Sequence, residues 1–178
     1  MKISKTHHYN IGSRDLIDIY LSKDFFHYRF EMANVHNYQI VQFGPVGDKF
    51  VTTVKRPIKV RVPTSLPKAI KRLVDRENVA ITSMEWELHG EHSRSGNYSF
   101  SLEGIPVEVK GTNIISSNGD DATNQLEIEI TCRIPFIGKK IASLVAEKII
   151  SGIEKDYIGT KHYIENQWVS PNNKESLE

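Results

Sequence analysis

Apolar and polar residues alternate with a period of two along five stretches in the middle of the chain. These stretches are residues 49–62, 79–89, 98–102, 105–115 and 126–134. Successive side chains of a β-strand point to opposite faces, so each stretch predicts a strand with one apolar and one polar face. Weaker patterns at 2–10 and 37–43 predict two more strands. Clean alternation of this kind is typical of an antiparallel sheet with one buried face and one face in water.

A different period governs Ile134–Glu165, which predicts one long amphipathic helix after the last strand. At about 100° of rotation per residue, most of its apolar side chains fall within one half of the helix. At roughly 40 Å, the helix is long enough to cross a small domain. Gly152, Asp156 and Thr160 interrupt the apolar half. Either these residues face an interior space, or a bend carries Asp156 to the rim, where it pairs with a nearby cation.

Shorter elements are predicted from capping and turn residues. Ser13 can cap a helix over Arg14–Leu21, and a second short helix is expected over Phe25–Ala33. A third short helix is expected within Pro63–Arg76, with Pro67 in its first turn. Ser116–Thr123 is rich in Ser, Asn, Gly and Asp and predicts a loop between two strands.

One charged residue falls on an otherwise apolar strand face. Arg56 shares its face of the 49–62 strand with Val54 and other apolar residues. A buried Arg needs an acidic partner, and Asp156 is one candidate. Pro57 cannot donate a ladder hydrogen bond, which suggests an edge, a bulge or a strand break. We therefore expect a register change at Pro57 that takes Arg56 off the apolar face.

The composition fits one ordinary globular domain, with 178 residues, 39% hydrophobic and 25% charged. We assign residues 1–168 to this domain and residues 169–178 to a flexible polar tail. The formal net charge of +1 gives no reason to expect nucleic acid as a partner. The sequence contains no apolar run long enough for an integral membrane segment and no signal-peptide pattern. Cys132, the single cysteine, suits a reducing cytoplasm and is expected to be buried as a small hydrophobe.

No catalytic, cofactor or metal motif stands out. His89 and His92 are close in sequence but lack the further ligands of a metal centre, so we expect no metal. The sequence has no phosphate-binding glycine loop and no nucleophile motif, and it implies no cofactor. Acid–base chemistry in a cavity would need Asp156 together with His27 or Tyr157, and only perturbed pKa values would mark such a pair.

Four short motifs, taken in their order and spacing, resemble a known family. They are Leu66-Pro67, Glu85-Trp86, Glu103–Pro106 and Ile134–Lys140. With the order of strands and helices, they make the chain similar to the START-like, polyketide-cyclase-like (SRPBCC) superfamily, and within it to a bacterial family of unknown function. The resemblance implies an α+β helix-grip fold, in which a curved antiparallel sheet wraps around a long C-terminal helix. It also implies an apolar cavity between sheet and helix and transfers no catalytic residue.

The leading functional hypothesis is a carrier or sensor that binds a hydrophobic small molecule or lipid in this cavity. The alternatives are a cyclase-, dehydratase- or hydrolase-like enzyme that uses the same cavity, and a ligand-free protein that acts through protein contacts. The sequence does not fix an oligomeric state. The residues expected to line the cavity are Trp86, Tyr98, Phe100, Val109, Ile128, Ile149, Gly152, Asp156 and Thr160.

Overall fold

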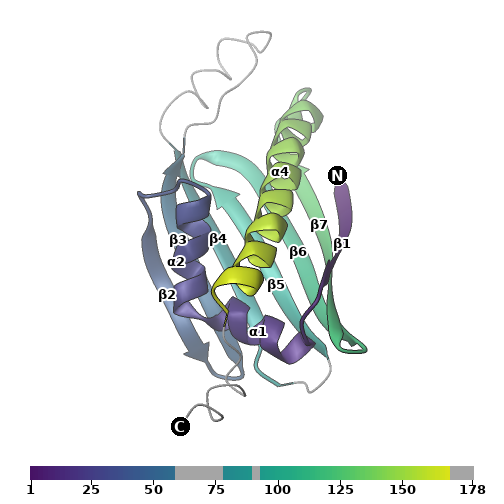
Figure 1. The fold of residues 1–178 in the computed structure, drawn as a ribbon. Coiled ribbons are helices and arrows are strands. Elements are labelled where there is room, and N and C mark those ends of the chain that lie inside the picture. Colours follow the sequence, from purple (N-terminus) through teal and green to yellow (C-terminus); the bar gives the residue numbers. More distant parts are fainter. Residues whose placement is uncertain (59–77, 90–92, 169–178) are drawn as a thin grey trace.

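The structure is a computed structural model that describes residues 1–58, 78–89 and 93–168. Within these residues, seven strands form one antiparallel sheet in the order β1-β7-β6-β5-β4-β3-β2. The strands are β1 (Lys2–Tyr9), β2 (Gln39–Val46), β3 (Lys49–Ile58), β4 (Asn78–Glu87), β5 (Ser93–Leu102), β6 (Ile105–Asn118) and β7 (Asp121–Cys132). The helices are α1 (Ser13–Leu21), α2 (Lys23–Met32) and α4 (Gly138–Asn166). The predicted α+β architecture, a curved sheet with a long C-terminal helix on one face, is confirmed (Figure 1).

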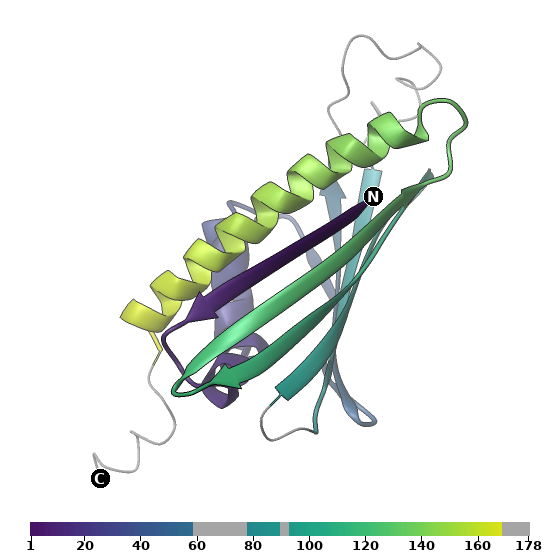
Figure 2. The ribbon, with the colours of Figure 1, turned by 90° about the vertical axis from the view of Figure 1, so that its right-hand side faces the viewer.

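The alternation in the sequence becomes a difference between the two faces of the sheet. On β6, Val107 and Val109 point to the helix side and are buried, whereas Glu108 and Lys110 between them are exposed. The same alternation holds along β7, and the side view shows α4 against one face only (Figure 2). Burial of one face therefore fixes the strand register, because a slip by one residue would turn the apolar set into water.

The helix α4 runs diagonally over the concave face and lies mainly along β7 and β1 (Figure 1). The Nζ atom of Lys5 on β1 lies 2.7 Å from a carboxylate oxygen of Glu154. The Tyr157 hydroxyl donates a hydrogen bond of 3.0 Å to the carbonyl oxygen of His8. The N-terminal half of α4 buries Ile141, Ala142 and Ala146 in the largest core cluster of the described residues.

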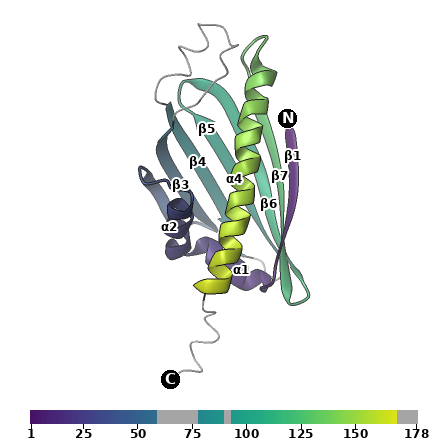
Figure 3. The same cartoon turned by 45° about the horizontal axis from the view of Figure 1, so that its top comes forward.

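The helices α1 and α2 lie beside the C-terminal half of α4 (Figure 3). Ser22 caps α2, and its side-chain oxygen accepts a hydrogen bond of 3.0 Å from the backbone N–H of Phe25. The prediction that Ser13 caps α1 is wrong. Ser13 is the first helical residue after Gly12, and its hydroxyl lies 2.7 Å from the hydroxyl of Ser117 on β6.

The expected register change at Pro57 is also wrong. β3 pairs with β4 without a shift along its whole length, so Arg56 stays opposite the buried Ala80 and on the concave face. Within the described residues, the pairing of β2 with β3 ends at Lys55, so β3 is the sheet edge at Pro57. A proline is tolerated at such an edge because the strand has no partner on one side that would accept a hydrogen bond from a backbone N–H.

The predicted loop over Ser116–Thr123 is shorter than expected. β6 and β7 continue as a paired ladder to Asn118 and Asp121, and the hydroxyls of Ser116 and Thr123 lie 2.9 Å apart across it. Gly119 has φ of 66°, a conformation that glycine adopts without strain, and this permits a tight turn. The polar residues of this stretch therefore belong to the end of a β-hairpin and not to a long loop.

Some predictions fall outside the described residues. These are the helix over Pro63–Arg76, the polar tail at 169–178, and His92 of the histidine pair. No helix in the described part of the chain combines the length and the apolar character needed to span a bilayer.

Candidate functional site

The concave face is covered unevenly. Val109, Ile128 and Ile130 on β6 and β7 are buried beneath α4. Several inward-facing side chains of β4 and β5 are only half-buried, although they lie on the same face. We call this part the open concave region. It comprises the inward-facing Arg56, Thr82, Met84, Tyr98 and Phe100 of the sheet. Ile149 and Ile153 of α4 pack against the same core cluster as Tyr98 and Phe100, and we include them together with Gly152, the exposed residue before Ile153.

Tyr98 is a polar side chain of the open concave region, and its pKa is shifted by burial and by nearby charges. Burial raises the pKa of Tyr98 to about 12, and the nearby charges of Arg56 and Arg29 lower it in part, while Asp156 raises it. The phenol therefore stays protonated at neutral pH. The charges of Arg56, Arg29 and Asp156 therefore all affect the pKa of Tyr98.

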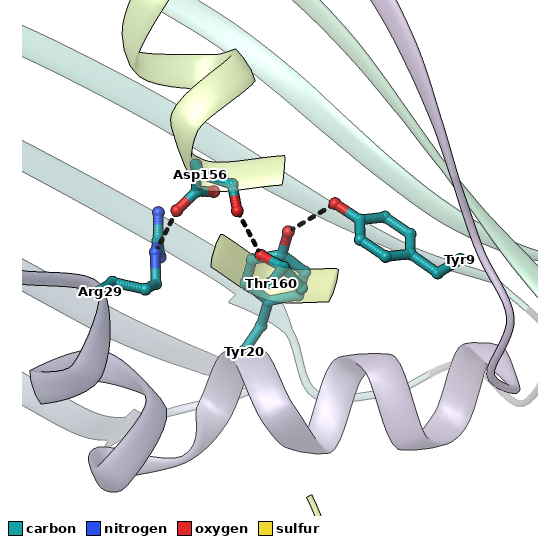
Figure 4. Close-up of polar contacts among 5 residues, drawn as sticks. All are labelled: Tyr9, Tyr20, Arg29, Asp156 and Thr160. Atoms are coloured by element: carbon teal, nitrogen blue, oxygen red, sulfur yellow. Dashed lines mark hydrogen bonds and ion pairs between the residues drawn. The ribbon is translucent and has the colours of Figure 1, made fainter. Parts of the chain in front are cut away.

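Asp156 and Arg29 form an ion pair that joins α4 to α2. A carboxylate oxygen of Asp156 on α4 lies 2.5 Å from Nε of Arg29 on α2 (Figure 4). Burial lowers the pKa of Arg29, but Asp156 and Tyr20 more than offset this, so the pKa is raised overall. The structure therefore agrees with the second interpretation of Asp156, in which this residue lies at the rim and pairs with a nearby cation.

Thr160 is not free to serve a ligand. Its side chain is completely buried, and its hydroxyl donates a hydrogen bond of 2.7 Å to the carbonyl oxygen of Asp156 one turn earlier (Figure 4). The hydroxyls of Tyr20 and Tyr9 lie 3.3 Å apart beside it. Burial raises the pKa of both phenols, with Tyr20 and Asp156 among the further causes at Tyr9. This cluster joins α1, α4 and β1.

Three other predicted lining residues belong to the core. Trp86 is 2% exposed and packs in one cluster with Leu16 and Ile17 of α1, so a helix covers it. Val109 and Ile128 are buried under α4. The hydrophobic pattern predicts the inward face correctly, but it does not distinguish positions covered by helices from positions left open.

Three of the remaining predicted residues belong to one cluster. Tyr98, Phe100 and Ile149 are half-buried and pack at the margin of the largest core cluster. Gly152 is exposed, and a Cβ atom built on it would meet nothing within 4 Å. The list of expected lining residues omits Thr82 and Met84, although the alternation of the 79–89 strand places both on its inward face. It also omits Arg56, because a register change at Pro57 is expected to take Arg56 off the apolar face.

The acid–base pairs weighed from the sequence are not assembled. The ring nitrogen Nδ1 of His27 lies 2.8 Å from the hydroxyl of Tyr38, and Tyr157 donates to the backbone of His8. The Asp156 carboxylate is engaged by Arg29. Within the described ranges, no group of three or more His, Cys, Asp or Glu side chains is placed to hold a metal ion.

A small hollow at the surface of β6 and β7 is smaller than an ordinary ligand pocket. Its volume is about 150 Å³. Ligand pockets usually measure about 300–1,000 Å³. Its lining residues are Pro106, Val107, Glu108, Thr131 and Arg133.

His7 carries a testable pH dependence. Its ring stacks on Tyr157 at 4.2 Å between centroids, and its Nε2 atom is buried without a described hydrogen-bond partner. Burial lowers the pKa of His7 below 6.5, although Glu154 and Asp156 oppose this. The unfolded chain therefore takes up a proton at a higher pH than the folded chain, and the free energy of unfolding falls as pH drops below 6.5.

We expect the variant His7→Phe to lose part of this pH dependence. The phenyl ring keeps the stacking on Tyr157 and cannot be protonated. Urea unfolding between about pH 5 and about pH 8 measures the effect. The exposed neighbour His8 is the matched control, and His8→Phe should keep the wild-type slope. Identical slopes for His7→Phe and the wild type would contradict the assignment.

The curved antiparallel sheet with one long C-terminal helix across its concave face is a helix-grip fold. The chain belongs to the family described as "Protein of unknown function (DUF2505)", which matches residues 4–164. The predicted family relationship is therefore confirmed. No curated protein matches the chain.

Solved structures show the same fold at low sequence identity. Norcoclaurine synthase from Thalictrum flavum, in complex with dopamine and hydroxybenzaldehyde, has 15% identity and a TM-score of 0.59, covering 95% of this chain and 89% of that chain. A START superfamily protein from Mycobacterium smegmatis has 12% identity and a TM-score of 0.52, covering 92% and 98%. The protein TTHA0849 from Thermus thermophilus has 12% identity and a TM-score of 0.56, covering 91% and 95%.

Proposed function

We propose that this protein is a carrier or sensor that binds a hydrophobic small molecule or lipid in the open concave region. The observation that carries the proposal is the incomplete burial of Met84, Tyr98 and Phe100. All three lie on the inward face of the sheet, which α4 covers only in part. Inward-facing apolar side chains are normally covered, and a concave apolar surface with few polar groups is the usual form of a ligand site.

Two further points support this proposal. The structural neighbour norcoclaurine synthase is described with dopamine and hydroxybenzaldehyde bound, so the same fold holds small aromatic molecules in that protein. This is support by analogy of fold, which does not fix function. The free thiol of Cys132 suits a reducing compartment, which supports the cytoplasm as the place of action.

The variant Gly152→Leu tests the proposal. The position is exposed, and no described atom lies within 4 Å of an added Cβ, so the leucine fits without a clash. Replacing a helical glycine should stabilise α4 by up to about 1 kcal/mol. A leucine that projects over the open concave region should weaken ligand binding by about 1–3 kcal/mol, or roughly 5- to 150-fold.

Titration with Nile red, an uncharged dye that fluoresces in apolar surroundings, measures the affinity. Ser151→Leu is the matched control, because Ser151 is an exposed residue on the polar half of the same helix. We expect wild-type affinity for Ser151→Leu and reduced affinity for Gly152→Leu, with both variants fully folded. Equal affinities for all three proteins would remove Gly152 from the site.

A further inference from the structure

Arg56 is the cation on the sheet side of the open concave region. Its place opposite Ala80 puts it on the concave face, and its charge acts on the phenol of Tyr98. None of the ion pairs formed among the described residues includes Arg56. A partly buried guanidinium in apolar surroundings is costly without an anion beside it.

Arg29, another cation near this region, differs from Arg56 because it pairs with a carboxylate. Its Nε atom is 2.5 Å from the Asp156 carboxylate, so its charge is already neutralised within the protein. The two arginines thus act on the same phenol, but only Arg56 lacks a carboxylate among the residues that the structure describes. Among the described residues, Arg56 is therefore a cation on the concave face that no carboxylate neutralises.

Tyr98 adds a second polar group. Its phenol stays protonated at neutral pH, because burial raises the pKa of Tyr98 to about 12. The hydroxyl forms no hydrogen bond with another described residue, unlike the hydroxyls of Tyr9, Tyr20 and Tyr28. A guanidinium and a phenol on one apolar surface are donors suited to a carboxylate, which accepts several hydrogen bonds and carries one charge.

We propose that the ligand of the open concave region is a hydrophobic carboxylic acid. Its carboxylate pairs with Arg56 and accepts a hydrogen bond from Tyr98, while its apolar body lies against Met84, Phe100 and Ile149. The inference rests on the proposed function and narrows the ligand from any hydrophobic molecule to an acidic one. Alkyl and aromatic acids share this chemistry, so the test includes one of each.

The test compares each acid with its uncharged ester. Dodecanoic acid, cinnamic acid and their methyl esters are titrated into the full chain, with displacement of Nile red as the readout. We expect the dissociation constant of each acid that binds to be about 10- to 100-fold lower than that of its ester. The reason is that a hydrogen bond to a charged group contributes about 1.5–3 kcal/mol. This preference is measured on the wild type and needs no variant.

Variants of β3 then assign the preference to one residue. Arg56→Gln should remove the preference, and Arg56→Lys should restore most of it, since the positive charge returns. Lys55→Gln removes the same charge from the adjacent residue, whose side chain points to the convex face, and should leave the preference unchanged. A melting curve of each variant confirms that it is folded.

The outcomes separate this inference from the proposed function. Equal binding of acid and ester, or a preference that survives in Arg56→Gln, overturns the inference and leaves the proposed function standing. An equal loss in Lys55→Gln also overturns it, because the effect would then be one of net charge. Absence of binding for all four compounds and for Nile red contradicts both.

Discussion

Replacing Trp86 by alanine should lower the free energy of unfolding by about 3–5 kcal/mol. Trp86 is 2% exposed and packs in one cluster with Leu16, Ile17 and Ile115. Its removal leaves a large cavity between the sheet and α1, and a rigid sheet cannot collapse to fill it. Urea unfolding of the wild type and of Trp86→Ala gives the difference directly.

A second substitution shows whether the ring occupies the place described. A Cβ atom on Gly96 would lie 2.6 Å from the ring of Trp86, so Gly96→Ala forces the ring to move. We expect Gly96→Ala alone to cost about 1–3 kcal/mol. In the Trp86→Ala background this clash is gone, so the double variant should be no less stable than Trp86→Ala alone. Additive losses in this double-mutant cycle would contradict the packing of Trp86 over Gly96.

This result bears on the site as well as on stability. The sequence places Trp86 among the residues expected to line a cavity, but the structure puts it under α1 with the core. Loss of ligand affinity in Trp86→Ala would therefore reflect disturbed core packing and not a lost ligand contact. Substitutions at Tyr98 or Phe100 are better probes of the open concave region, since both side chains are only half-buried.

The variant Gly111→Ala should destabilise the sheet itself. A Cβ atom on Gly111 would lie 2.6 Å from the carbonyl oxygen of Glu127 and 2.9 Å from Cγ1 of Ile128 on the neighbouring strand. The carbonyl belongs to the backbone of β7, so the clash can be relieved only by shifting the ladder between β6 and β7. We expect a loss of about 1–3 kcal/mol or more in the free energy of unfolding.

Gly152→Ala is the matched control for Gly111→Ala. Gly152 is exposed, and no described atom lies within 4 Å of its added Cβ, so alanine should raise stability by up to about 1 kcal/mol through helix propensity. Opposite signs for the two glycines, measured by urea unfolding, would confirm that Gly111 is required by close strand approach. A neutral Gly111→Ala would show that the ladder adjusts without cost.

The strands and the long helix could be predicted because their periodicity comes directly from burial. The buried Val107 and Val109 alternate with the exposed Glu108 and Lys110, and this alternation determines both the strand and its inward face. Local polar signals were less reliable. Ser13 resembles a helix cap but contacts Ser117, because the tertiary partner competes with the local one.

The site could be predicted only in part. Whether an inward-facing residue is open or covered depends on the position of α4 across the sheet, and no local pattern encodes that position. Val109 and Phe100 face the same way, but only Val109 is fully beneath the helix. The sequence does not place Arg56 in the open concave region, because an arginine on an apolar face suggests a register error, whereas β3 and β4 pair without a shift.

The most direct measurement is native mass spectrometry of the wild type, Gly152→Leu and Ser151→Leu after incubation with a total lipid extract. Denaturing extraction then identifies what is bound. We predict one bound hydrophobic molecule per chain in the wild type and in Ser151→Leu, with most of it lost in Gly152→Leu. An unliganded mass for the wild type, or the same bound mass in all three proteins, would contradict ligand binding in the open concave region.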